Sequence, residues 1–365
     1  MICLLTNDPA IAQVDILKKA VEHTNQCFNM SYSQIARQKN PFSGDWVSLN
    51  VKTSVSYDRA IGKDIYNTEE SRGFQNVYNG STEMDLDLND KTYTLNKDAT
   101  DDNYRTPYYW IRLIKRKLTA SPKEIKSLPD TTINKIVCFH VKMTIADTIA
   151  NREIYDLYFN KSTYLPVRIV QLMEGKFGKG DFTSDNVALM INEDTYSDYH
   201  LNAASFDDIK AFIIPIDFQP EKKTKPLAIG QKAPTWILKD LQGNTWSDEK
   251  LKGKIVIMDF SFNECAACAL SIPLLKKISD QYRSANVEVI SVNTSNTKAS
   301  VIAFDQKNGI KYPVLLNGAA VSKNFQVSAF PFFYVINKQG NIAASFEGYG
   351  NELENELTQQ IEKLH

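Results

Sequence analysis

Two cysteines, Cys265 and Cys268, are the residues of this chain most suited to chemistry. They follow a mainly apolar run, 255–260, and precede a segment that predicts a helix from Ala266 to about Ala285. Because only two residues separate the sulfurs, one helical turn brings them within bonding distance, and a disulfide can open and close with little backbone movement. A loop this short removes little chain entropy from the unfolded state, so the spacing favours a redox couple over a structural disulfide.

The expected helix gives the two thiols different roles. Cys265 would lie at the N-terminus of the helix, where unpaired backbone N–H groups and the helix dipole favour a thiolate and lower the thiol pKa. Cys268 lies one turn further along and should stay protonated to higher pH. We therefore expect Cys265 to attack a partner and Cys268 to resolve the resulting mixed disulfide.

A zinc site is the alternative interpretation of the pair. It needs two more ligands at suitable spacing, and the sequence has no second C-x-x-C and no H-x-x-x-H pair. The four histidines, His23, His140, His200 and His365, are scattered and have no carboxylate or cysteine at ligand spacing. We therefore expect no metal and no cofactor.

Residues 230–365 resemble the thioredoxin-fold domain of the TlpA-like, redoxin-type disulfide reductases. The motifs that carry the resemblance are Gly-Gln-Lys-Ala-Pro at 230–234, Asp-Phe-x4-Cys-x2-Cys at 259–268, and Phe-Pro at 330–331 before the apolar strand 332–336. The resemblance implies an α/β thioredoxin fold and an enzyme that is a protein disulfide reductase, or thiol-disulfide oxidoreductase. Its substrates would be protein thiols or disulfides, and a membrane redox partner would recharge the pair.

The same resemblance assigns roles residue by residue. Cys265 becomes the nucleophile and Cys268 the resolving cysteine, while Pro331, in a cis peptide bond, faces the sulfurs and places backbone beside them for an extended substrate. Asp259 aligns with the buried acid of thioredoxin, where desolvation would raise its pKa and suit it to take the proton from Cys268. A strand-end aspartate that only accepts hydrogen bonds is the equal alternative for Asp259.

Glu264 and Phe330 depart from the pattern of the family, and we assign both to substrate binding. Glu264 stands where relatives carry an aromatic residue, and its charge opposes thiolate formation at Cys265. Phe330 stands where relatives often carry Thr or Val, and its ring narrows the set of partners. Ala266-Ala267 replace the Gly-Pro that tunes the redox potential in relatives, so the direction of electron flow stays open.

A peroxidase of the peroxiredoxin class shares the fold and is a further alternative. Its chemistry needs a threonine three residues and a proline seven residues before the attacking cysteine. Those positions hold Phe262 and Met258 before Cys265, and Cys265 and Ser261 before Cys268. The sequence therefore disfavours a peroxidase.

The first part of the chain predicts an antiparallel sheet. Apolar and polar residues alternate in several short segments, for example 46–51 and 154–159, and Asn79-Gly80 is a favourable hairpin turn. Helices at about 14–25 and 107–118 would cover one face of this sheet. We expect an α+β domain here, built on a curved antiparallel sheet.

This pattern resembles the LolA-like, or lipoprotein-localisation, fold, a strongly bent sheet around an apolar cavity. The resemblance rests on the segments 78–80, 88–93 and 155–166. It gives an alternative function, a carrier or binding protein of the cell envelope whose thioredoxin-like domain is an auxiliary redox sensor. A domain that positions the thioredoxin unit against its client protein fits equally well, and no residue is assigned to a ligand.

Length and composition agree with two domains. The chain has 365 residues, of which 43% are hydrophobic and 11% aromatic, enough for two cores. We expect an antiparallel-sheet domain at 13–214, a linker at 215–229 and a thioredoxin-like domain at 230–365. The net charge of -1 argues against a nucleic-acid binder, and the sequence assigns no oligomeric state.

The N-terminus favours export. Ala-Ile-Ala at 10–12 matches the A-x-A pattern that a signal peptidase accepts, so residues 1–12 are expected to be the remnant of an export signal; an ordinary chain end is the alternative. Export predicts a location in the periplasm or cell envelope. Cys27 and Cys138 then remain beside the redox pair, either bridged in an oxidising compartment or separately buried.

Overall fold

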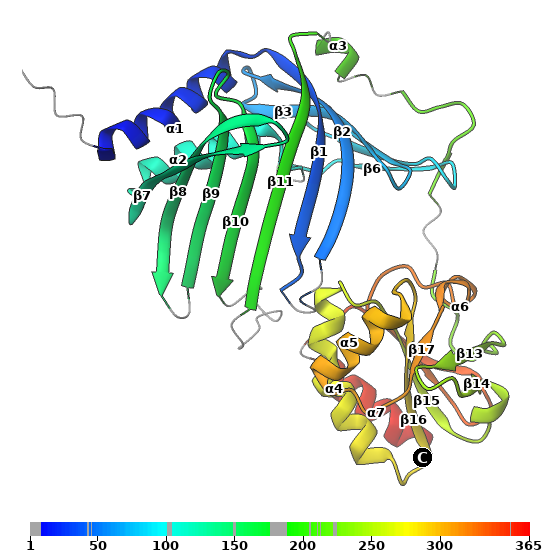
Figure 1. The fold of residues 1–365 in the computed structure, drawn as a ribbon. Coiled ribbons are helices and arrows are strands. Elements are labelled where there is room, and N and C mark those ends of the chain that lie inside the picture. The colour runs from blue at the N-terminus through cyan, green and yellow to red at the C-terminus, as the bar shows by residue number, and fades with distance from the viewer. Residues whose placement is uncertain are drawn as a thin grey trace, which may run out of the picture. The chain divides into compact units, whose positions relative to one another are not determined.

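The computed structural model describes residues 9–41, 44, 46–100, 104–148, 151–175, 188–203, 206–209, 211, 213–221, 225–350 and 352–365. The chain divides into two compact units, and the main division falls between Glu221 and Lys222. Figure 1 shows a first unit made mainly of a sheet and a second unit in which strands and helices alternate along the chain. Each unit is described by itself.

The first unit is built on one twelve-stranded sheet. Its strand order is β12-β6-β5-β4-β3-β2-β1-β11-β10-β9-β8-β7. All neighbours pair antiparallel except β12, which runs parallel to β6. The strands are β1 (Asn29–Lys39), β2 (Trp46–Asp58), β3 (Lys63–Glu70), β4 (Phe74–Tyr78), β5 (Glu83–Asp87), β6 (Thr92–Asn96), β7 (Glu124–Ile133), β8 (Ile136–Thr148), β9 (Asn151–Asn160), β10 (Pro166–Gly175), β11 (Ala188–Leu201) and β12 (Gln219–Pro220).

Two helices, α1 (Pro9–Gln26) and α2 (Pro107–Thr119), pack on this sheet, and a short helix, α3 (Phe206–Ile209), follows β11. The expected antiparallel sheet with two covering helices is therefore confirmed. The side chain of Thr106 accepts a hydrogen bond from the backbone N–H of Tyr109, which caps α2 at its N-terminus. The backbone of 10–12, the expected cleavage region, is part of α1, while residues 1–8 lie outside the described residues.

The helix-covered face of the sheet carries a large packed cluster. Trp110 and Ile114 of α2 are fully buried there, together with tyrosines and aliphatic residues of the strands. Two aspartates with no exposed surface also lie in this unit, Asp64 paired with Arg112 and Asp194 paired with Arg105. Each ion pair offsets the cost of burying a charge. Neither pair could be predicted from the hydrophobic pattern of the sequence.

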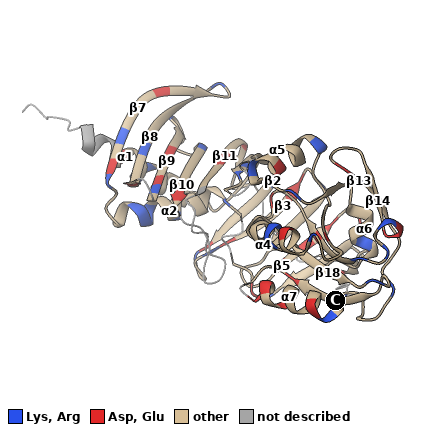
Figure 2. Ribbon diagram, turned by 90° about the horizontal axis from the view of Figure 1, so that it is seen from below, with Lys and Arg blue, Asp and Glu red and all other residues tan. Residues whose placement is uncertain are grey.

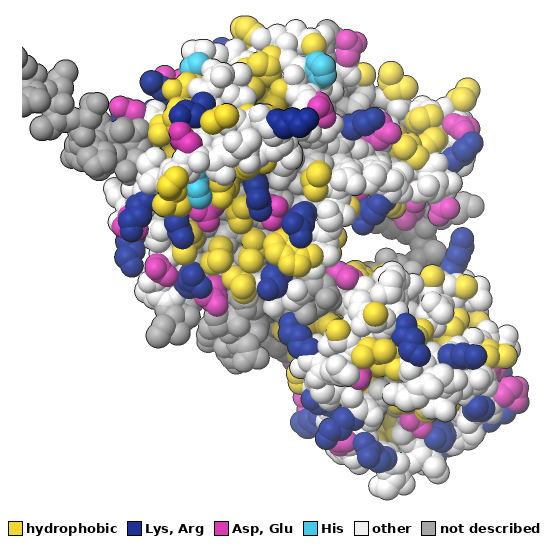
Figure 3. Space-filling view, in the orientation of Figure 1, with side chains coloured by type: hydrophobic (Ala, Val, Ile, Leu, Met, Phe, Trp, Pro, Cys, Tyr) yellow, Lys and Arg dark blue, Asp and Glu magenta, His cyan; other side chains and the backbone are white. Residues whose placement is uncertain are grey.

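Charge is distributed over both units rather than gathered by sign. Figure 2 shows Lys and Arg interspersed with Asp and Glu along the described elements, in agreement with the net charge of -1. Apolar side chains also reach the surface in scattered positions, as the face in Figure 3 shows. Trp46, 42% exposed, lies under the guanidinium of Arg37, whose Cζ is 4.6 Å from the ring centroid.

The second unit contains a seven-stranded sheet in the order β14-β13-β17-β16-β15-β18-β19. β15, β16 and β17 are parallel, and β18 runs antiparallel to β15. This arrangement, with helices on the sheet, has the topology of the thioredoxin fold, as expected. Its elements are β13 (Ile237–Asp240), β14 (Thr245–Ser247), β15 (Ile255–Ser261), α4 (Ala266–Tyr282), β16 (Val287–Asn293), α5 (Lys298–Asn308), β17 (Val314–Leu316), α6 (Ala319–Asn324), β18 (Phe332–Ile336), β19 (Ile342–Glu347) and α7 (Leu353–Leu364).

The central strand β15 is buried along almost its whole length because both faces of the sheet are covered. Ile255 and Ile257 face α4 and α7, while Val256 and Met258 belong to the cluster on the opposite face. Two parts of the segment expected to link the units are packed. β12 pairs with β6, and Leu227, 4% exposed, lies in the core of the second unit.

Candidate active site

The two cysteines lie where β15 ends and α4 begins. Cys265 is the N-cap residue of α4, and its Sγ accepts a hydrogen bond of 3.1 Å from the backbone N–H of Cys268. The two residues are joined by a disulfide, with their Cα atoms 5.2 Å apart. An amide N–H and the helix dipole are thus directed at the sulfur of Cys265, which is the arrangement that stabilises a thiolate after reduction.

Both cysteines have little exposed surface. Cys265 is 8% exposed and Cys268 4%. Cys265 is the more accessible of the two, and the surroundings enclose it more closely than its position at the helix N-terminus alone suggests. Phe262 and Phe330, from the loops before Cys265 and before Pro331, stack edge to face with ring centroids 5.2 Å apart.

Pro331 lies at the same end of the sheet as the cysteines. The Phe330–Pro331 peptide bond is cis, as expected. β18 begins directly after it, and Phe332 pairs with Phe260 near the end of β15. The carbonyl of Pro331 accepts a hydrogen bond of 2.8 Å from the N–H of Gly348. The register of three neighbouring strands therefore fixes this loop at the end of the sheet where the Cys265 loop starts.

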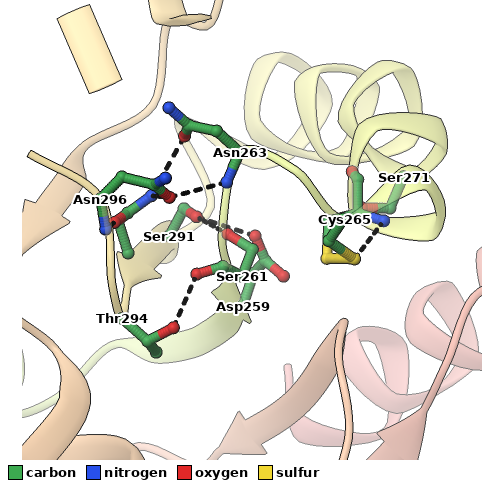
Figure 4. The surroundings of a disulfide bond; sticks show 10 residues. Asp259, Ser261, Asn263, Cys265, Ser271, Ser291, Thr294 and Asn296 are labelled. Atoms are coloured by element: carbon green, nitrogen blue, oxygen red, sulfur yellow. Dashed lines mark hydrogen bonds between the residues drawn. A yellow bond between two sulfur atoms is a disulfide. The ribbon is translucent and has the colours of Figure 1, made fainter. Parts of the chain in front are cut away.

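Asp259, on β15, lies in the interior of the second unit. It is 3% exposed, and burial raises the pKa of its carboxyl from 3.8 to about 7. Its Oδ2 accepts a hydrogen bond of 2.8 Å from Ser291, whose hydroxyl is 2.9 Å from that of Ser261. Asp259 and Cys268 line the same cavity of about 20 Å³, which is room for one water molecule. Figure 4 shows Asp259 between the two serines and the disulfide.

Glu264 is held by a neighbouring loop. The side-chain amide of Asn296 donates to both carboxylate oxygens of Glu264, at 2.9 and 2.8 Å. The Oδ1 of Asn296 accepts from the backbone N–H of Asn263, 2.8 Å away, and from the side chain of Asn293 (Figure 4). The carboxylate expected to contact substrate is thus anchored to the loop between β16 and α5.

The sequence interpretation missed this asparagine cluster. Asn263 is 1% exposed and Asn293 3%, and their side chains hydrogen-bond to each other. They join the loop before the nucleophile to the loop after β16, so the position of Cys265 depends on a segment some thirty residues away. Asparagines in loops are common, and only the parallel pairing of β15 with β16 brings these three together.

Two further cysteines lie within the described part of the chain. Cys27 and Cys138 are free thiols, so the bridge that was one of two alternatives is not formed. Burial raises the pKa of both thiols, which keeps them protonated and unreactive at neutral pH. Within the described part of the chain, no three His, Cys, Asp or Glu side chains are grouped to hold a metal ion. Nor does any helix there have the length and apolar character needed to cross a bilayer.

Comparison with known sequences places the second unit among redox proteins. The AhpC/TSA family matches residues 229–345. The thiol-disulfide oxidoreductase ResA of Bacillus thuringiensis subsp. konkukian is 25% identical over 143 residues, which are 39% of this chain and 82% of that protein. The thioredoxin-like protein YneN of Bacillus subtilis is 28% identical over 124 residues, covering 33% of this chain and 72% of that protein.

Two solved structures align with a little over a third of the chain. The thioredoxin domain of a thiol-disulfide oxidoreductase from Bacteroides vulgatus aligns with a TM-score of 0.35 and 24% identity, covering 37% of this chain and 99% of that domain. A thiol:disulfide interchange protein of the thioredoxin family from Chlorobium tepidum aligns with a TM-score of 0.35 and 20% identity, covering 38% of this chain and 97% of that protein. The sequence relatives support a thiol-disulfide oxidoreductase-like domain over the C-terminal part of the chain.

Proposed function

We propose that this protein is a thiol-disulfide oxidoreductase that exchanges disulfides with protein cysteines, with Cys265 attacking and Cys268 resolving. The observation that carries the proposal is the position of Cys265 as the N-cap of α4, with the N–H of Cys268 donating to its sulfur and the disulfide partner already in place. Named relatives with the same class of activity support it.

The reductive direction runs in two exchanges. The Cys265 thiolate attacks one sulfur of a client disulfide, so that the client S–S bond breaks, a mixed disulfide forms, and one client thiolate leaves and takes a proton from water. Cys268 then passes its proton to Asp259 and attacks the sulfur of Cys265. The Cys265–Cys268 bond forms, the second client thiolate leaves, and two electrons have moved from the protein to the client. The oxidative direction is the reverse of these steps.

Other residues of the site support this chemistry. The cis bond before Pro331 presents an extended backbone segment beside the disulfide, where a client segment can lie. Phe330 and Phe262 supply an aromatic surface for it, and Glu264, fixed by Asn296, adds a carboxylate next to the nucleophile. In this assignment Asp259, which burial makes a weak acid, serves as the proton acceptor for Cys268.

The cellular setting belongs to the same proposal. Each client disulfide oxidises the Cys265–Cys268 pair, so the protein needs a donor that reduces the pair again. We assign this role to a membrane redox partner in the periplasm or cell envelope. We assign the first unit a LolA-like architecture and the role of positioning the redox unit against its client. Most of its helix-covered face is a packed cluster of buried side chains, which favours the positioning role; a hollow of about 670 Å³ between α1, α2 and the start of β7 is the space that a carrier role would use.

Reduction of insulin by dithiothreitol tests the proposal on the full-length protein. The wild-type protein should accelerate the reaction, and Cys265→Ser should reduce the rate to that of dithiothreitol alone. When oxidised insulin is added without dithiothreitol, reduced Cys268→Ser should form adducts through Cys265 that it cannot resolve. Cys27→Ser, which changes a free thiol of the other unit, is the matched control and should keep the wild-type rate. No acceleration by wild type, together with peroxide consumption that Cys268→Ser leaves unchanged, would instead identify a peroxidase.

A further inference from the structure

We propose that Ser291, backed by Ser261, is a positioning residue that orients the Asp259 carboxylate toward Cys268 and keeps it able to accept the proton of the resolving step. The inference rests on the proposed function, because it concerns the second exchange in that reaction. It adds two hydroxyl side chains that lie outside the C-x-x-C and cis-proline motifs.

The strand register brings the three side chains together. β15 and β16 pair in parallel with Asp259 opposite Ser291, so both side chains leave the sheet on one face. Ser261 lies two residues after Asp259 on the same strand and therefore points to that face as well. This is the face that α4 covers and on which Cys268 lies. The grouping is a consequence of pairing, and Figure 4 shows it.

The hydrogen bonds define a direction. A serine hydroxyl has one proton, and Ser291 gives its own to Asp259 Oδ2 at 2.8 Å. When Asp259 is ionised, Ser261 is therefore left as the donor in the 2.9 Å contact between the two serine oxygens. A hydroxyl that accepts one hydrogen bond donates a stronger one, so Ser261 polarises Ser291 toward the carboxylate. Both hydroxyls therefore favour the charged form of Asp259 and oppose the effect of burial.

The other carboxylate oxygen is the one left for chemistry. Oδ1 of Asp259 is buried and has no hydrogen-bond partner among the described residues. A buried acceptor without a partner is costly, and such an atom usually has a functional role or a bound water. Because Ser291 occupies Oδ2, the carboxylate keeps Oδ1 for the cavity that Asp259 shares with Cys268. A proton from Cys268 can be received there directly or through one water.

The described residues that line the cavity provide no cation that could stabilise the ionised form of Asp259. The titratable side chains that line the cavity with Asp259 are Cys268 of α4, Asp305 of α5 and Tyr312 before β17. Burial raises the pKa of both Asp305 and Tyr312; each is neutral when protonated and negative when ionised, so neither can supply positive charge. Among the described residues that line the cavity there is no Lys, Arg or His. The serine hydroxyls are therefore the groups that favour the ionised form of the carboxyl against the effect of burial.

The resolving step can be measured alone. The reduced full-length protein is treated with an aromatic disulfide whose released thiolate absorbs visible light, so that Cys265 forms the mixed disulfide and Cys268 then expels the second thiolate. The rate of this second release should rise with pH through the ionisation of Asp259. Loss of a hydrogen bond to a carboxylate moves its pKa by about one unit, so Ser291→Ala should move the midpoint to higher pH by about one pH unit. Ser261→Ala should give a smaller shift in the same direction.

Control variants separate orientation from stability. Ser291→Thr keeps the hydroxyl and should restore the wild-type midpoint. Ser271→Ala removes a buried hydroxyl that donates to the carbonyl of Cys268 and does not touch Asp259, so it should leave the midpoint in place. If Ser291→Ala does not fold, Ser261→Ala and a carbon-13 titration of the Asp259 carboxyl in that variant carry the test.

Two results have different meanings. Profiles of Ser291→Ala or Ser261→Ala that superimpose on the wild-type profile overturn this inference and leave the proposed function standing. Failure of the wild-type protein to form a mixed disulfide at Cys265, or to release the second thiolate, overturns the proposed function itself.

Discussion

Removing the buried carboxyl of Asp259 should change how the stability of the redox unit depends on pH. The folded pKa of about 7 lies above the ordinary value of 3.8, so the unfolded chain releases this proton first as pH rises. Between pH 4 and pH 7 the folded state binds one more proton than the unfolded state, and the free energy of unfolding falls with rising pH. The contribution of Asp259 is therefore complete below about pH 4 and is lost as pH rises through 7.

The magnitude follows from the size of the pKa difference. About three pH units at about 1.4 kcal/mol each amount to about 4 kcal/mol. Asp259→Asn cannot titrate and keeps an acceptor for Ser291, so it removes this pH dependence. We expect the variant to gain about 4 kcal/mol relative to wild type between pH 4 and pH 8.5. The gain is a difference between two pH values and does not depend on the other effects of the substitution.

Amide hydrogen exchange of the peptide that contains β15 is the suitable assay, because it reports on this unit and not on the first one. The oxidised protein is used, since neither cysteine titrates in the disulfide. Asp240→Asn is the matched control: burial alone would raise the pKa of Asp240, but hydrogen bonds from Trp246 and Asn244 outweigh it and lower the pKa. That variant should therefore lose stability at neutral pH. Exchange curves of Asp259→Asn that stay parallel to wild type across the range would falsify the assignment of a raised pKa.

Two further outcomes are expected. Asp194→Ala should reduce the stability of the first unit by about 3–5 kcal/mol, because Arg105, Gln34 and Trp110 lose their buried acceptor. Amide exchange of β11 measures this loss, and the control is Asp130→Ala in the exposed pair with Lys161, which should cost less than about 1 kcal/mol. Equal losses of stability in the two variants would count against the prediction. In the reduced protein, alkylation of Cys265 should show a thiol pKa below about 8.5, and ordinary alkaline ionisation would remove the basis for its role as nucleophile.

The local signals in the sequence were sufficient for the elements that carry the cysteines. An apolar run predicted β15, and the C-x-x-C predicted the start of α4. The end of α5 (Lys298–Asn308) also depends on a local signal, because Gly309 ends that helix in the left-handed conformation, which a residue with a side chain adopts at a cost. These features depend on neighbours in the chain, so a pattern of residues reveals them.

Features that depend on pairing between distant strands could not be predicted. Ser291 meets Asp259 only because β16 lies beside β15 in one register, and Asn296 reaches Glu264 for the same reason. The enclosure of Cys265 likewise depends on where Phe330 falls relative to Phe262. A sequence shows which of these residues are polar or aromatic, whereas their contacts exist only after the sheet has formed.

Trapping of client proteins tests the central claim most directly. Full-length Cys268→Ala lacks the resolving thiol, so mixed disulfides formed by Cys265 should accumulate with protein clients, survive without reductant and disappear when dithiothreitol is added. Mass spectrometry should locate the client cysteine on Cys265, and Cys265→Ala/Cys268→Ala should trap nothing. Adducts that persist in this double variant, or no adduct in Cys268→Ala, would contradict disulfide exchange through Cys265.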